Sequence, residues 1–143
     1  MRARAFALGI AAALAFGPAA AQHAQVADSI VVRLGIVPAA TLGQFPAEAM
    51  HASELPSGSQ HVLITLADVR NGTPLEAAKV VVRVTDPKGA AQSKQLVASR
   101  TVGIPDYSET FTFGWSGRYR IHVTVEPKAG KAVDADFVWM HVV

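Results

Sequence analysis

Two methionine–histidine pairs are the residues in this chain best suited to chemistry. Met50 precedes His51 within EAMHASELPSGSQHV (residues 48–62), and Met140 precedes His141 within VWMHVV. Thioether and imidazole groups together suit copper, above all Cu(I), better than they suit calcium or magnesium. The pairs therefore predict a site for a soft metal ion. The alternative is that they arise by chance and that Met140 fills a gap in the core.

The chain has no cysteine, so any metal ligands must come from other side chains. Alternate residues of a strand face opposite sides, and Asp134 and Asp136 should face water, so His141 is expected to point inward. Met140 then lies on the opposite face, and the two residues cannot easily bind one ion together. A loop is not bound by that rule, and two loop residues can converge on one ion. The predicted metal ligands are Met50, His51, His61, His141 and Glu48, with Asp106 as a further possible oxygen donor.

Other histidines and aromatic residues are assigned simpler roles. His23 receives no role, and His122, which lies beside Arg118 and Arg120, is expected to be an exposed strand residue. The aromatic residues within 107–115 are expected to fill the core. The alternative is that this region forms a surface for a partner.

No catalytic motif marks the chain as an enzyme. GWSGR (residues 114–118) has Arg118 where a nucleophile elbow requires glycine. Phosphate-binding, dinucleotide-binding and zinc-protease motifs do not occur in the sequence. The protein is therefore predicted to have no catalytic residues.

The N-terminus has the layout of a secretory signal peptide. Arg2 and Arg4 precede an apolar stretch and then Ala19-Ala20-Ala21, so cleavage is expected before Gln22. Residues 22–143 would then form one exported domain, delivered to the periplasm by the general export pathway. The apolar stretch is too short to span a bilayer, and no second span follows.

Removal of the signal peptide balances the charge of the chain. The whole sequence has 13 Lys and Arg against 11 Asp and Glu, and loss of Arg2 and Arg4 leaves 13 − 2 = 11 against 11. No basic stripe is visible, so nucleic acid is not an expected partner. The absence of cysteine also excludes a disulfide framework, so stability must come from burial.

Short alternating runs separated by turn residues predict an all-β protein. The pattern favours an antiparallel, immunoglobulin-like β-sandwich of about seven strands in a single domain, with a Tyr119 corner near the start of one strand. A long connection, 39–60, is expected between the first two strands, with a helical turn around 46–53. Asn71-Gly72 and Asp86–Gly89 are predicted to form turns. The seven predicted strands cover 30–37, 61–70, 79–85, 92–99, 108–114, 118–126 and 132–143.

Three stretches resemble periplasmic iron-uptake accessory proteins that carry a copper or iron site on an immunoglobulin-like sandwich. EAMHA (48–52) is similar to a Glu-Ala…His-Ala segment of that family, and PDYSETF (105–111) to a Pro-His-Tyr-Gly segment. GRYRIHVTVEP (117–127) is similar to a Gly-x-Tyr strand that ends in proline. More loosely, the chain resembles YtkA-like exported sandwich domains, which implies no defined activity.

The first resemblance implies a ligand role for His51, with Glu48 close by. Asp106 stands where the family has histidine, and the nearest candidate for the family's methionine ligand is Met50. The leading hypothesis is a non-enzymatic periplasmic protein that binds copper or iron through residues 48–61, closed by His141. It would buffer the ion or present it to a membrane transporter. The rival hypothesis is a metal-free domain that binds another envelope protein through a strand edge or the region 107–115.

Overall fold

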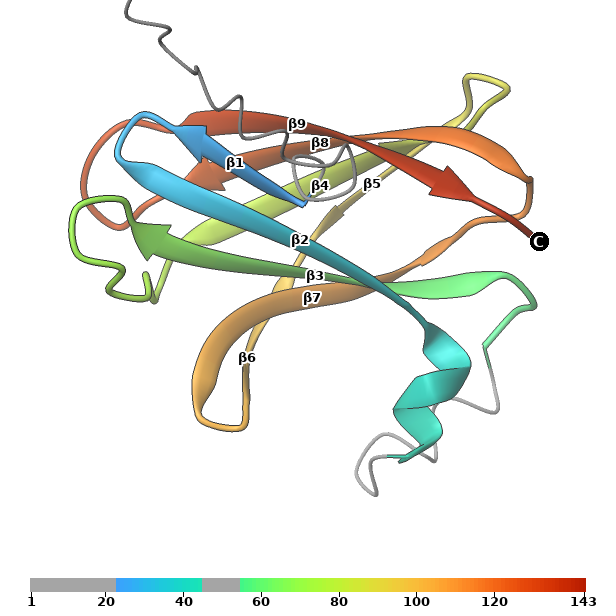
Figure 1. Cartoon of the computed structure of the whole chain (residues 1–143), viewed down its shortest axis with the longest axis horizontal. Helices are drawn as coiled ribbons and strands as arrows, with labels where there is room; N and C mark the ends of the chain where they lie inside the picture. The colour runs from blue at the N-terminus through green and yellow to red at the C-terminus, as the bar shows by residue number, and fades with distance from the viewer. Residues whose placement is uncertain (1–22, 45–54) are drawn as a thin grey trace, which may run out of the picture.

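The computed structural model describes residues 23–44 and 55–143, which form two β-sheets packed face to face (Figure 1). All pairings between neighbouring strands are antiparallel, which confirms the predicted all-β sandwich. No helix in these described residues is long and apolar enough to cross a membrane. The elements are β1 (Ala24–Ala27), β2 (Ile30–Pro38), the 3-10 helix η2 (Ala39–Gln44), β3 (Ser59–Asp68), β4 (Lys79–Thr85), β5 (Ala91–Gln95), β6 (Val97–Thr101), β7 (Ile104–Thr112), β8 (Gly117–Glu126) and β9 (Val133–His141).

The strand order determines which residues meet between the sheets. The five-stranded sheet has the order β1-β2-β3-β7-β6, and the four-stranded sheet has the order β5-β4-β8-β9. On β8, Tyr119, Ile121 and Val123 are fully buried, and the residues between them face outward. The same period of two on β2, β3 and β4 buries rows of Val, Ile and Leu. Each such side chain contributes about 1.5–3 kcal/mol of transfer free energy.

The described residues form nine strands, where about seven were predicted. β1 lies outside the predicted strands and pairs with β2. The predicted polar strand at 92–99 is two strands, because the chain passes from one sheet to the other at Leu96. Leu96 is buried, and its N–H donates to the carbonyl of Val80 at 2.8 Å. One extended run thus serves both sheets.

The long connection between β2 and β3 begins with η2 and ends in a tight loop. The Gly58 carbonyl accepts from the N–H of Phe113 at 2.8 Å, and Gly58 has φ +82°. A Cβ at this position would lie 2.9 Å from the Phe113 carbonyl oxygen, so only glycine fits there. The predicted helical turn around 46–53 lies outside the described residues.

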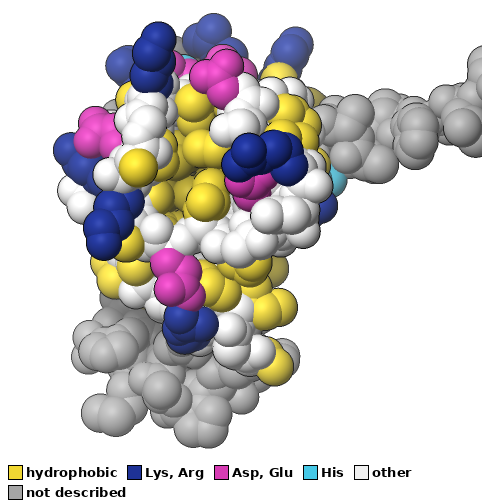
Figure 2. Space-filling model, turned by 90° about the vertical axis from the view of Figure 1, so that its left-hand side faces the viewer, with side chains coloured by type: hydrophobic (Ala, Val, Ile, Leu, Met, Phe, Trp, Pro, Cys, Tyr) yellow, Lys and Arg dark blue, Asp and Glu magenta, His cyan; other side chains and the backbone are white. Residues whose placement is uncertain are grey.

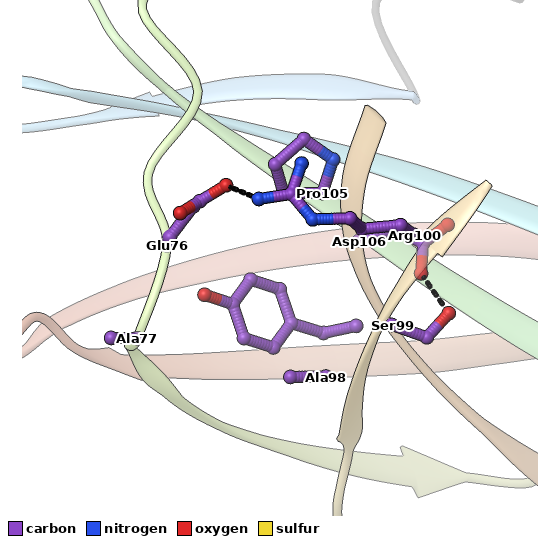
Figure 3. Close-up of a pocket in the computed structure, with 8 residues that line it drawn as sticks. Glu76, Ala77, Ala98, Ser99, Arg100, Pro105 and Asp106 are labelled. Atoms are coloured by element: carbon purple, nitrogen blue, oxygen red, sulfur yellow. Dashed lines mark hydrogen bonds and ion pairs between the residues drawn. The ribbon is translucent and has the colours of Figure 1, made fainter. Parts of the chain in front are cut away.

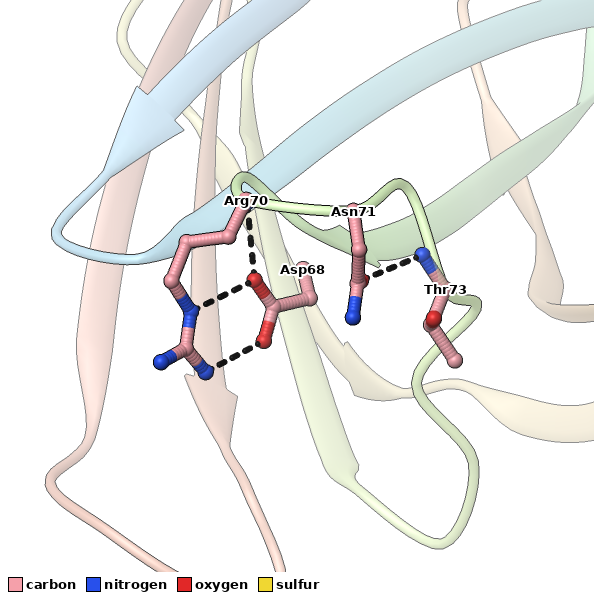
Figure 4. A network of polar contacts seen from close by, with 4 residues as sticks. All are labelled: Asp68, Arg70, Asn71 and Thr73. Atoms are coloured by element: carbon pink, nitrogen blue, oxygen red, sulfur yellow. Dashed lines mark hydrogen bonds and ion pairs between the residues drawn. The ribbon is translucent and has the colours of Figure 1, made fainter.

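Asn71-Gly72 forms a turn, as predicted, but within a connection between the two sheets. Asn71 Oδ1 accepts from the N–H of Thr73 at 3.0 Å (Figure 4). Asp68 accepts from the Arg70 guanidinium at 2.9 and 3.2 Å and from the Arg70 N–H at 2.8 Å. The turn at Asp86–Gly89 does join a hairpin, β4–β5. There the Asp86 carboxylate accepts two backbone N–H groups.

Candidate metal centre

Tyr119 fixes the loop at the end of the sandwich where β9 finishes. Its side chain is fully buried, and its hydroxyl accepts from the N–H of Trp115 at 3.1 Å and donates to the Trp115 carbonyl at 3.0 Å. Tyr119 therefore acts as the predicted tyrosine corner, because its hydroxyl forms hydrogen bonds with backbone groups of the loop four residues upstream. Residues 113–117 are therefore held from within the core.

His141 lies against this aromatic cluster. It is the last residue of β9, opposite Gly117 in register. Its ring centroid is 5.4 Å from that of Phe113 and 5.9 Å from that of Tyr119, and its side chain is half-buried. The predicted inward direction of His141 is confirmed. The imidazole is thus held between the sheets near their open end.

His61, unlike His141, lies on the side of its strand that faces away from the core. In β3 it lies beside Val62, whose side chain is fully buried in the core, and it pairs with Val37 and Thr110 on the neighbouring strands. Because successive side chains alternate, His61 projects from the face of the five-stranded sheet that points away from the core. His61 therefore lies on the outer side of the five-stranded sheet, whereas His141 lies on its inner side, between the two sheets.

Three of the five predicted ligands, Glu48, Met50 and His51, lie outside the described residues. Within 23–44 and 55–143, no group of three or more His, Cys, Asp or Glu side chains is placed to hold a metal ion. The described chain resumes at Leu55 and runs beside Phe113 through the Gly58 contact.

Met140 does not fill a gap in the core. Its side chain is 60% exposed and lies on the outer face of the four-stranded sheet, opposite Arg118. The prediction that Met140 and His141 face opposite ways is confirmed, but the core role for Met140 is wrong. The reason is the alternation itself, which gives the inward position to His141.

Asp106 lies in a cleft of its own. Its side chain is only 2% exposed and accepts from the Ser99 hydroxyl at 2.8 Å. The cleft has a volume of about 480 Å³, and an ion pair between Glu76 and Arg100 lies across it (Figure 3). Asp106 and His61 both belong to the outward row of the five-stranded sheet, but Asp106 lies opposite Ser99 of β6 and His61 opposite Thr110 of β7. The Ser99 hydroxyl of β6 therefore helps to fix the Asp106 carboxylate.

A second polar cluster, around His122, was missed by the sequence analysis. Nδ1 of His122 lies 2.7 Å from Asp136 and Nε2 lies 3.1 Å from Asp134. The hydrogen bond with Asp136, followed by the charges of both carboxylates, raises the pKa of His122 despite some desolvation. The register of β8 and β9 places His122 opposite Asp136, and a local pattern does not specify this register. Within the described residues these three side chains are not placed to hold a metal ion, so this cluster binds a proton between His122 and its two carboxylates.

The comparisons with known proteins identify the fold. No family model matches the chain, and no curated protein matches it. Among solved structures, a DUF4426 family protein from Pseudomonas aeruginosa PAO1 matches with TM-score 0.66 and 14% identity over 83% of this chain and 96% of that chain.

Two further solved structures contain copper. A copper-bound variant of FetP from uropathogenic Escherichia coli strain F11 matches with TM-score 0.66 and 11% identity over 85% of this chain and 95% of that chain. The copper-reconstituted P19 protein from Campylobacter jejuni matches with TM-score 0.63 and 10% identity over 82% and 92%. The resemblance to sandwich proteins with a copper or iron site is therefore confirmed for the fold.

Proposed function

We propose that this chain is an exported, non-enzymatic metal-handling protein of the periplasm that binds copper or iron through residues 48–61. The observation that carries the proposal is the fold shared with FetP and P19, both of which hold copper in solved structures. The ligand chemistry supports it, because Met50, His51 and His61 are the donors expected for copper in a chain without thiolates.

The placement of the two described histidines defines two versions of the site. In the first, His51 and Glu48 or Met50 meet His61 on the outer face of the five-stranded sheet. In the second, the same loop residues meet His141 at the end of the sandwich. A fully extended residue covers at most about 3.3–3.6 Å, so the segment between His51 and Gly58 is long enough for either version.

The test is titration of the exported protein with copper and with iron, followed by calorimetry and elemental analysis. We expect stoichiometric binding that is lost in H51A combined with H61A. H122A is the matched control, because His122 lies on the opposite sheet and pairs with carboxylates. H141A distinguishes the two versions, since only the second loses affinity in this variant. Unchanged affinity in the H51A/H61A protein would overturn the proposal.

A second candidate function has a specific observation in its favour. The edge strand β6 and its turn to β7 expose apolar side chains at Val97, Val102 and Ile104. A free strand edge with such residues can pair with another envelope protein without any metal. The aromatic residues Tyr107, Phe111 and Phe113 are buried, so of the predicted aromatic surface only Trp115 remains exposed. A proline in β6 would then abolish recovery of the partner while metal content stays unchanged.

A further inference from the structure

The end of the sandwich around Trp115 exposes several large apolar side chains. The Trp115 side chain is 49% exposed and that of Met140 is 60% exposed, and Val142 and Val143 follow β9 at the same end. In Figure 1 this is the right-hand end, where the C-terminus, the start of β8 and the β4–β5 turn lie together. Four of the ten large exposed hydrophobic residues in the described chain therefore gather at one end.

Three segments are joined into one surface there. Lys88, in the β4–β5 turn, holds its ammonium 3.2 Å from the centroid of the Trp115 ring. A Cβ on Gly117 would lie 2.9 Å from Pro87, so the turn and the 113–117 loop are in close contact. The N–H of Val143 donates to the Ser116 hydroxyl at 2.9 Å. The Trp115 backbone is anchored by Tyr119, and the ring is directed outward.

Three basic side chains lie at this end. Lys88, Arg118 and Arg120 lie beside the apolar residues, and within the described part of the chain none of the three forms an ion pair with a carboxylate. The acidic residue nearest in sequence, Asp86, accepts hydrogen bonds from the backbone of Lys88 and Ala90. Across the strands, Arg118 lies opposite Met140 and Arg120 opposite Val138, so no acidic residue faces them on β9.

We propose that the Trp115 end, formed by Lys88, Trp115, Arg118, Arg120 and Met140, docks on the surface of an anionic phospholipid bilayer. Tryptophan is enriched at the membrane–water interface because its ring is apolar and its N–H can remain in contact with water. Basic residues next to it add attraction to anionic headgroups, and arginine matches phosphate oxygens in bidentate geometry. The attachment is peripheral and reversible, since it combines one shallow apolar contact with a few charges.

This docking does not depend on metal binding. The five residues that define the surface, Lys88, Trp115, Arg118, Arg120 and Met140, are not among the candidate ligands Glu48, Met50, His51, His61 and His141. A protein that failed to bind copper or iron would still be expected to dock, and a protein that failed to dock could still bind metal. The two proposals therefore fail separately.

The experiment is co-sedimentation of the exported protein with lipid vesicles at low salt. Its N-terminal residue is determined first, so that residues 1–21 cannot account for binding. We expect the protein to pellet with vesicles containing phosphatidylglycerol and to remain in solution with pure phosphatidylcholine. Because each basic residue near an anionic surface contributes roughly a fivefold gain in partitioning, K88Q combined with R118Q should weaken binding roughly 25-fold.

Matched variants distinguish docking through the Trp115 end from nonspecific association with the vesicles. W115S removes the apolar contact but keeps the backbone bonds to Tyr119, so the corner should fold normally. V102S removes an exposed hydrophobic residue from the β6–β7 turn, and R33Q removes an exposed charge from the other sheet. We expect W115S to lose binding and the two controls to retain it, with unchanged melting temperatures. No pelleting of the unaltered protein, or equal losses in test and control variants, would overturn the proposal.

Discussion

The two ends of the sandwich hold their loops in opposite ways. At the Trp115 end, the buried hydroxyl of Tyr119 bonds the loop backbone from below and leaves the surface side chains available for contacts. At the other end, formed by the loops 28–29, 69–73 and 127–131 around Asp68, polar side chains bond to their own loop. Figure 2, which faces that other end, shows acidic and basic side chains lying next to one another.

The difference shows how anchoring determines what a surface can do. Asp68 and Arg70 satisfy each other, so their charges are largely neutralised for any partner. Lys88 and Arg118 have no such carboxylate within the described residues. A loop fixed by a buried group therefore keeps its charged side chains available to a partner, whereas a loop fixed by its own side chains uses some of those charges internally.

The largest expected effect comes from removing the ring that supports the Trp115 end. Phe113 is fully buried, with its centroid 4.4 Å from that of Tyr119. F113A should lower the free energy of unfolding by about 3–5 kcal/mol, because it removes buried area and leaves a cavity. Urea unfolding gives the loss, and NMR should show the His141 ring shifting while Asp68 is unchanged. A loss below about 1 kcal/mol would mean that the aromatic cluster does not support this end.

The two buried tyrosines provide a more selective comparison. Tyr107 accepts from the N–H of Ala78 at 3.1 Å and donates to the Leu75 carbonyl at 3.2 Å. These bonds flank Ala77, which has φ +58° and is held in a strained conformation. Y107F and Y119F should each cost about 1–3 kcal/mol, because each leaves buried backbone groups without a partner.

Hydrogen exchange distinguishes the two tyrosine variants. Y107F should accelerate exchange at residues 75–78 and leave 113–117 protected, and Y119F should do the reverse. If either variant accelerates exchange at both places, the two loops are not held independently.

The pH dependence of stability should report the His122 cluster. Because both carboxylates favour the imidazolium, the folded pKa of His122 lies above its ordinary value of 6.5. Its stabilisation is therefore fully present below about pH 6.5 and is lost as the pH rises through the folded pKa. The cluster is largely exposed, so we expect less than about 1 kcal/mol. Thermal unfolding between pH 5.5 and 8.5 should show this fall, and H122Q should flatten it.

The smallest effect is expected at the Asp68 end. Hydrogen bonds from the side chain and backbone of Arg70 lower the pKa of Asp68 from 3.8 to about 2. Its contribution to stability is therefore present above about pH 3.8 and is lost as the pH falls through the folded value. NMR titration of the Asp68 carboxyl should give this value, and R70Q should raise it. A titration near 3.8 in the unaltered protein would show that the ion pair does not form in solution.

Strand identity could be predicted from the sequence because alternation is a local property. The row Tyr119, Ile121 and Val123 specifies one buried face without reference to any other strand. The division at Leu96 could not be predicted, since a change of sheet depends on the position of Val80 elsewhere in the fold. β1 is short and mostly exposed, so it carries little pattern to detect.

The candidate site was predictable only in part, for a similar reason. Alternation alone gave the inward direction of His141. That His61 projects from the far side of its sheet follows from the pairing of β3 with β2 and β7, which local pattern does not specify. The His122 cluster depends on the register between β8 and β9, which the connection 127–132 sets.

The contact between β1 and β9 has a consequence for how the protein folds. The ring of His23, just before β1, lies 5.4 Å from the ring of Trp139 in β9, so the first and last strands meet. Closing so long a loop is entropically costly, and folds dominated by such distant pairings form slowly. The sandwich cannot close until β9 is available. A chain stopped before Val133 would leave β8 and β1 without their neighbour and would expose one flank of the core as an aggregation-prone edge.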